Sequence, residues 1–205
     1  FMTLMFQVFV SYITIKLDET HGLLDESLKN TWSSFVILLL MIGLIYMMKN
    51  RKFPFIVLQG FFVLFSILTG LMLSSVIHTI NDKHIIEASV IATLINFFSF
   101  LILGFIIVYF KYNLDWLGIF LFIALLALII SRIFLLLVPD YDKYKKMSRY
   151  LSIIGVVIFS IYILYDTNVI LLRYKNKDNV DCISGALDYY LDIVNLFTHY
   201  LDIKS

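Results

Sequence analysis

The chain of 205 residues is too apolar for a soluble domain: 61% of its residues are hydrophobic and its mean hydropathy is +0.92, whereas soluble domains have roughly 45–50% apolar residues. A net charge of +1 gives no support for a nucleic-acid-binding face. The single cysteine, Cys182, cannot form an internal disulfide or a structural zinc site, which usually needs four ligands. We therefore expect an integral membrane protein whose main partner is the lipid bilayer, with no nucleic-acid partner.

Seven apolar runs follow one another along the chain, separated by short polar breaks. Runs of about 17–25 apolar residues are typical of helices that span a membrane. The first run lacks the basic start and the small-residue cleavage site of a signal peptide, so it is also expected to span. The sequence predicts helices near residues 1–17, 31–48, 53–77, 87–110, 116–138, 150–172 and 183–203.

The short links between these runs predict one all-α membrane domain over residues 1–205. Helices joined by such links must be antiparallel neighbours, which gives a single bundle. The last run is the most polar, so six spans plus a re-entrant C-terminal segment is an alternative. Orientation stays open, because the lysines and arginines of the short loops divide seven to six between the two sides.

The last run carries a stripe of polar side chains. Asp192 lies near its middle, where an aspartate costs at least ~2.5 kcal/mol and is expected to face the bundle interior or water. The other interpretation is an amphipathic helix that lies at the membrane surface with its polar face toward water. Five residues spaced 4, 3, 4 and 3 positions apart share this face: Asp188, Asp192, Asn195, His199 and Asp202.

A second aspartate, Asp166, interrupts the sixth run. Counted from the loop at 173–182, Asp166 is about seven residues deep and Asp192 about ten, or roughly 10 and 15 Å. Antiparallel neighbours would bring the two carboxyls together, and both cannot ionise cheaply in a low-dielectric site. Such a pair would form a pH-sensitive latch or an oxygen-ligand site for calcium. The alternative is two unrelated aspartates, each neutral or paired with a hydroxyl group.

Other polar positions carry weaker signals. Arg132, near the end of the fifth run, can extend to the membrane surface or supply a countercharge to an aspartate. The sequence contains no GxGxxG, P-loop, HExxH, GxSxG or CxxC motif, so we expect neither an enzyme nor a cofactor. Small and polar residues recur every four positions on the third run, which favours close helix packing over ligand binding: Ser66, Gly70, Ser74 and His78.

The segments around the two aspartates carry a resemblance to a known family. "GVVIFSIYILYDTNVIL", which contains Asp166, and "GALDYYLDIVNLF", which contains Asp192, resemble the signature of the transmembrane Bax-inhibitor-motif family, in its Lifeguard and Golgi anti-apoptotic branch. Three further segments resemble that branch's second-to-third span junction, fourth span and fifth span: "NRKFPFIVLQGFFVLF", "HIIEASVIATL" and "LDWLGIFLFIALLALIISRIF". The resemblance covers nearly the whole chain in order, and the compact chain would suit one of the family's viral members.

This resemblance implies seven helices, with the last one central and wrapped by three antiparallel helix pairs. It also implies residence in Golgi or endoplasmic reticulum membranes, or in the plasma membrane if the source is prokaryotic. A passive calcium leak that lowers store calcium and inhibits apoptosis is expected there. In the family, the aspartates matching Asp166 and Asp192 form a hydrogen-bonded pair that senses pH and gates the leak, which makes them candidate calcium ligands. Candidates for the ion path or for support of the pair are Tyr165, Asp188, Asn195, His199 and Arg132.

Two positions depart from the family pattern. The first run has Thr3 where members usually have a basic residue, and Ser66 aligns close to a common acidic residue of the third span. Asp188, where the family often has Asn, adds a charge one turn from Asp192 that would partly compensate. The departures motivate a second hypothesis, a non-conducting protein that suppresses cell death through helix contacts with cell-death regulatory membrane proteins. An intramembrane aspartyl hydrolase would also use two aspartates, but no substrate-orienting glycine motif accompanies them.

Overall fold

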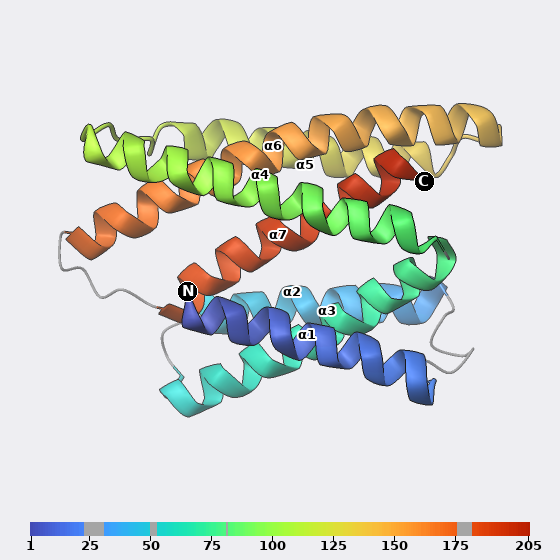
Figure 1. The fold of residues 1–205 in the computed structure, drawn as a ribbon, viewed down its shortest axis with the longest axis horizontal. Coiled ribbons are helices and arrows are strands. Elements are labelled where there is room, and N and C mark those ends of the chain that lie inside the picture. The colour runs from blue at the N-terminus through green and yellow to red at the C-terminus, as the bar shows by residue number, and fades with distance from the viewer. Residues whose placement is uncertain (23–30, 50–52, 81, 176–181) are drawn as a thin grey trace. The chain divides into compact units, whose positions relative to one another are not determined.

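The computed structural model describes residues 1–22, 31–49, 53–80, 82–175 and 182–205 (Figure 1). The predicted all-α fold is confirmed, because each of the seven predicted runs corresponds to one helix in these residues. The helices are α1 Met2–His21, α2 Thr31–Lys49, α3 Phe55–Ile80, α4 Lys83–Tyr109, α5 Leu117–Leu135, α6 Tyr141–Lys175 and α7 Cys182–Lys204.

Two helices begin earlier than the apolar runs that predicted them. α6 begins at Tyr141, nine residues before the predicted start. The Asp140 carboxylate accepts hydrogen bonds from the backbone N–H groups of Asp142 (3.1 Å) and Lys143 (3.3 Å), which satisfies donors that the start of a helix leaves unpaired. Asp82 caps α4 in the same way, and α4 begins at Lys83, four residues before the predicted start. The charged segment before the sixth run is therefore helical.

The outer surfaces of the helices are those of a membrane protein. Within the described residues, α3, α4, α5 and α6 are long and apolar enough to cross a membrane. Large apolar side chains lie exposed along them, such as Ile119 (69% exposed) and Phe122 (62% exposed) on α5. Soluble proteins rarely leave contiguous apolar patches of this kind in water, so these faces require lipid. That α1, α2 and α7 also span the membrane stays a prediction. α7 is one uninterrupted helix of 23 residues. This favours a span over the alternative of a re-entrant segment, because a re-entrant segment must reverse its direction within the membrane.

The helices group into two compact units that share α7. Unit 1 consists of Phe1–Asn81 and Asp181–Tyr190, and unit 2 consists of Asp82–Val180 and Leu191–Ser205. In unit 1, α1 and α2 both pack on α3, and in unit 2, α4 and α5 both pack on α6. Two predicted features, the single bundle and the three antiparallel helix pairs, depend on how the two units pack together. Both therefore stay predictions.

Helix α7 contacts all three of the other helices in each unit. In unit 1, Tyr190 is hydrogen-bonded to Ser11 of α1 (2.5 Å) and packs edge-on against Phe65 of α3, with 6.1 Å between ring centroids. Asp188 forms an ion pair with Lys49 at the end of α2 (3.0 Å). In unit 2, side chains of α7 are bonded to α4, α5 and α6. These contacts agree with the predicted central position of the last helix.

Candidate functional site

The two aspartates of the predicted pair both lie in unit 2. Asp192 on α7 is 3% exposed, and Asp166 on α6 is half-buried. Both carboxylates lie within electrostatic range of the hydroxyl group of Tyr162, which lies one turn before Asp166. Because charge interactions weaken with distance, the two carboxylates share one neighbourhood around this tyrosine. The direct hydrogen bond between them stays a prediction.

Helix α6 is held on both sides of Asp166 by contacts with glycines. A Cβ atom added to Gly118 of α5 would lie 2.6 Å from the Tyr165 hydroxyl oxygen. One added to Gly104 of α4 would lie 2.7 Å from the Thr167 Cβ. The overlap at Gly104 involves the Thr167 Cβ, so α4 approaches α6 closely there, whereas Gly118 of α5 meets the end of the Tyr165 side chain. The close crossing at Thr167 restrains α6 directly beside Asp166.

Asn168 ties the same stretch of α6 to the turn between α4 and α5. Its side-chain amide donates to the Tyr112 carbonyl (2.9 Å), and its side-chain oxygen accepts from the backbone N–H of Leu114 (3.1 Å). The side chain is fully buried, so both hydrogen bonds are needed to satisfy it. Sequence reasoning missed Asn168 as a positioning residue, although it follows Asp166 by two positions.

We expect Gly104→Ala to destabilise the protein by about 1–3 kcal/mol, because the added methyl group must displace Thr167. Gly43→Ala on α2 is the matched control, since nothing lies within 4 Å of its Cβ position. Alanine there should be neutral or stabilising by up to about 1 kcal/mol. Unfolding of both variants in detergent micelles with increasing SDS, followed by circular dichroism, measures the difference. Equal stabilities would contradict the close crossing of α4 and α6.

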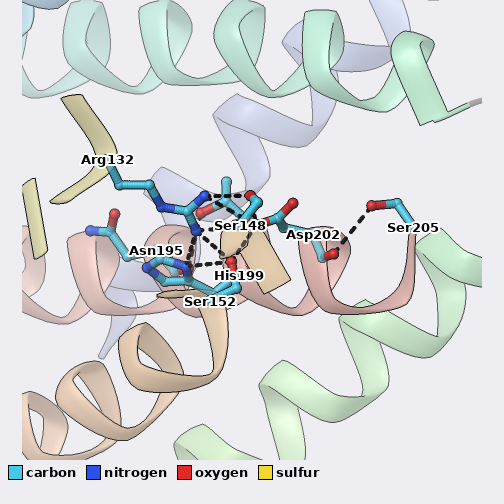
Figure 2. Close-up of polar contacts among 8 residues, drawn as sticks. Arg132, Ser148, Ser152, Asn195, His199, Asp202 and Ser205 are labelled. Carbon is cyan, nitrogen blue, oxygen red and sulfur yellow. Dashed lines mark hydrogen bonds and ion pairs between the residues drawn. The ribbon is translucent and has the colours of Figure 1, made fainter. Parts of the chain in front are cut away.

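A second polar cluster joins α5, α6 and the end of α7 in unit 2 (Figure 2). The Arg132 guanidinium donates to the Asp202 carboxylate from both terminal nitrogens, at 3.1 Å each. Two serines of α6 bridge this ion pair, because each accepts from the guanidinium and donates to the carboxylate. For Ser148 these distances are 2.8 and 2.7 Å, and Ser152 makes the same two contacts. Arg132 was predicted either to extend to the membrane surface or to supply a countercharge to an aspartate, and in the structure it supplies the countercharge to Asp202.

His199 completes this group, which we call the Arg132 cluster: Arg132, Ser148, Ser152, His199 and Asp202. The imidazole Nδ1 lies 3.2 Å from the Arg132 guanidinium and 3.3 Å from the Ser152 hydroxyl. Because a guanidinium only donates, Nδ1 accepts from it and the ring proton lies on Nε2. The ring lies against Gly155 of α6, where an added Cβ would overlap it, and beside Phe159 at 5.6 Å between centroids.

The predicted stripe on α7 therefore divides among separate partners. Asp188 pairs with Lys49 in unit 1, and compensation by its charge for the lost family charges stays a prediction. Asn195 donates to a carbonyl of its own helix (2.8 Å), and the last two members of the stripe belong to the Arg132 cluster. Tyr165 is directed toward Gly118 of α5.

Sequence reasoning missed a buried polar stripe on α1. Ser11 donates to the Ser66 carbonyl of α3 (2.8 Å). Ser74 of α3 donates to the Asp18 carboxylate (2.6 Å), and His78 lies 3.8 Å from the same carboxylate. The spacing that revealed the stripe on α7 is also present in the first run, and it was the available signal. Four residues spaced 4, 3 and 4 positions apart are each less than a tenth exposed: Gln7, Ser11, Thr14 and Asp18.

The small-residue face predicted on the third run packs against this stripe. A Cβ added to Gly70 would lie 2.8 Å from both the Ser11 carbonyl oxygen and the Thr14 Cβ. The predicted close packing is therefore confirmed. Ser66 is fully buried and donates to a carbonyl of its own helix (2.8 Å).

The two aspartates offer a small set of oxygen donors. Among the described residues, no three His, Cys, Asp or Glu side chains gather as a group that could hold a metal. Calcium takes about six to eight oxygen ligands. Asp166 and Asp192 would therefore supply only part of a calcium shell, with water or carbonyl oxygens supplying the rest.

Comparisons with known proteins agree with the resemblance. The family described as inhibitor of apoptosis-promoting Bax1 matches residues 1–204. Bax inhibitor 1 of Schizosaccharomyces pombe is 33% identical over 169 residues, which are 82% of this chain and 58% of the relative. Protein LIFEGUARD 1 of Arabidopsis thaliana is 33% identical over 175 residues, 83% of this chain and 70% of the relative. The Golgi anti-apoptotic protein of vaccinia virus (strain Lister) is 30% identical over 139 residues, 68% of this chain and 54% of the relative.

The family match runs through all seven helices of the described residues, including both segments that carry the aspartates. The chain spans 58% of the length of the yeast relative. The resemblance found in the sequence is thereby confirmed, and the chain belongs to the Bax inhibitor family.

Proposed function

We propose that the protein is a calcium leak channel of an intracellular membrane, and that its opening depends on the protonation of Asp166 and Asp192. One observation carries the proposal: both carboxylates lie in unit 2 within electrostatic range of the same tyrosine hydroxyl, with Asp192 almost fully buried. Ionisable residues inside a membrane are costly, and they mark ion and proton paths. Carboxylate oxygens are ligands that calcium prefers.

Proton sharing between the two carboxylates would couple pH to the contact between α6 and α7. With one proton, one carboxyl donates to the other and the pair carries a single negative charge. Loss of that proton leaves two negative charges in a low-dielectric site, where they repel each other. The close packing of Gly104 against Thr167, next to Asp166, restrains α6 against α4. The repulsion therefore acts on the spacing of the two helices.

The proposal extends to inhibition of apoptosis in Golgi or endoplasmic reticulum membranes. Two matched relatives are named Bax inhibitor 1 and Golgi anti-apoptotic protein. A leak of the proposed kind would lower the calcium content of the store in which the protein resides. Cell protection would then depend on the same two aspartates as the leak.

A second candidate function is a non-conducting protein that suppresses cell death through contacts with other membrane proteins. Two observations favour it. Ser66, close to a position where the family commonly has an acid, is fully buried and bonded to its own helix, so it packs instead of lining a path. Asp188 is neutralised by Lys49. Both features remove charge that an ion path would use.

Calcium flux separates the two functions. The protein is reconstituted in liposomes that contain a calcium-sensitive dye, and flux is measured over a range of pH. The leak predicts pH-dependent flux in the wild type and loss of that dependence in Asp166→Asn/Asp192→Asn, because asparagine has no carboxyl proton to lose. Glu87→Gln is the matched control, since the Glu87 side chain is 59% exposed on α4, and it should keep the wild-type profile. Absence of flux in the wild type, with cell protection intact in the double variant, would favour the non-conducting function.

A further inference from the structure

The first turns of α6 present a basic face. Three cationic side chains on this face lie exposed, whereas Ser148 and Ser152 on the adjacent face are buried as members of the Arg132 cluster. An open hollow of about 370 Å³ lies over the basic face. The residues that line it are spaced 3, 1, 3, 1 and 3 positions apart, which places them on one side of the helix: Asp142, Lys145, Lys146, Arg149, Tyr150 and Ile153.

The charge of this hollow is positive. Lys145, Lys146 and Arg149 contribute three cations, and Asp142 is the one acidic group among the lining residues that the structure describes. The neighbouring Lys143 is directed to Asp140 at 3.7 Å. Within the described part of the chain, no ion pair neutralises the three cations of the hollow. An anionic ligand is therefore favoured.

The depth of the cations matches the headgroup layer of a bilayer. The apolar part of α6 begins at Tyr150, and the three cations precede it by one to five residues, or roughly 1.5–7.5 Å along the helix. The polar layer on each side of a bilayer is about 5–8 Å thick. Tyr150 is 59% exposed, and tyrosine is enriched at this boundary. Ile153 lies one turn deeper, where acyl chains begin.

We propose that this hollow binds the phosphate-bearing headgroup of an anionic phospholipid in the surrounding bilayer. The planar Arg149 guanidinium offers two parallel donors to phosphate oxygens, and the lysines add point charges. A lipid also has acyl chains, which would contact Tyr150 and Ile153, whereas a free phosphate compound has none. The site is independent of the calcium leak.

Lipid titration of the full chain in detergent micelles tests the site. Phosphatidylserine and phosphatidylcholine are added separately, and bound lipid is measured by native mass spectrometry. The wild type should bind phosphatidylserine about 100-fold more tightly than phosphatidylcholine, since each basic residue near the surface adds favourable interaction with anionic lipid. Lys145→Gln/Lys146→Gln/Arg149→Gln should lose this preference. Raised salt should weaken the preference in the wild type.

Two control variants keep the test decisive. Lys16→Gln/Lys83→Gln/Lys111→Gln removes the same charge from exposed lysines outside the hollow and should keep the preference. Lys145→Arg/Lys146→Arg/Arg149→Lys retains the charge and should bind phosphatidylserine with an affinity within about threefold of that of the wild type. This variant tests the site also in the case that the neutralised variant does not fold. An unchanged preference in the neutralised variant, or an equal loss in the first control, overturns the proposal. Equally tight binding of soluble glycerophosphoserine also overturns it, because the ligand would then be a free phosphate compound.

Discussion

Arg132→Met is expected to lower the free energy of unfolding by about 2–3 kcal/mol. Without the guanidinium, the Asp202 carboxylate retains two serine hydroxyls but loses its countercharge. Breaking a fully buried ion pair costs about 3–5 kcal/mol. The Arg132 and Asp202 side chains are 31% and 32% exposed, so water screens part of that cost. Methionine keeps much of the apolar stem, which limits the loss of packing.

The control for this prediction is another ion pair of the same region. Lys143→Met breaks a pair with Asp140 whose side chains are 76% and 46% exposed, and the expected loss is at most about 1 kcal/mol. Arg132→Met/Asp202→Asn removes both charges and should recover part of the loss, so the double-mutant cycle isolates the pair. SDS unfolding in micelles measures Arg132→Met, Asp202→Asn, their double variant and Lys143→Met beside the wild type. Equal losses in the two single methionine variants would contradict a structural role for the Arg132 cluster.

The helices were predictable because the apolar length that a membrane requires is a local property of the sequence. The start of α6 was not predictable in this way. The apolar run begins at the lipid boundary, whereas the helix begins nine residues earlier, outside the apolar layer. The continuation depends on Asp140, whose carboxylate caps two backbone N–H groups. An Asp directly after Pro139 was the available signal for that start.

Spacing along α7 predicted which side chains share a face but not which partners they meet. Asp188 pairs with Lys49, which is 139 positions away in the sequence. His199 contacts Arg132, which is 67 positions away. Such partners depend on how helices cross, and the crossings depend on small contacts such as Gly104 against Thr167. Pattern alone therefore predicts candidate site residues more reliably than it predicts their arrangement.

Gly155→Ala is expected to destabilise the protein by about 2–3 kcal/mol, near the upper end for overpacking. The added methyl group would overlap the imidazole of His199. The ring has little room to move, because Phe159 lies beside it and the Ser152 hydroxyl contacts its Nδ1. Displacement would therefore also cost the contact between the ring and Arg132. Gly60→Ala on α3 is the control, since nothing lies within 4 Å of its Cβ position.

A compensating substitution distinguishes this overlap from a general weakening of α6. His199→Ala alone leaves a cavity and removes an acceptor from the Arg132 cluster, so it should also destabilise. Gly155→Ala/His199→Ala should be more stable than the sum of the two losses predicts, because the methyl group then occupies space that the ring has left. The coupling is expected to be about 1–2 kcal/mol and is measured by SDS unfolding of the four proteins. Additive losses would mean that the imidazole does not occupy the space beside Gly155. Positive coupling would mean that side-chain packing, in addition to the ion pair with Arg132, stabilises the end of α7.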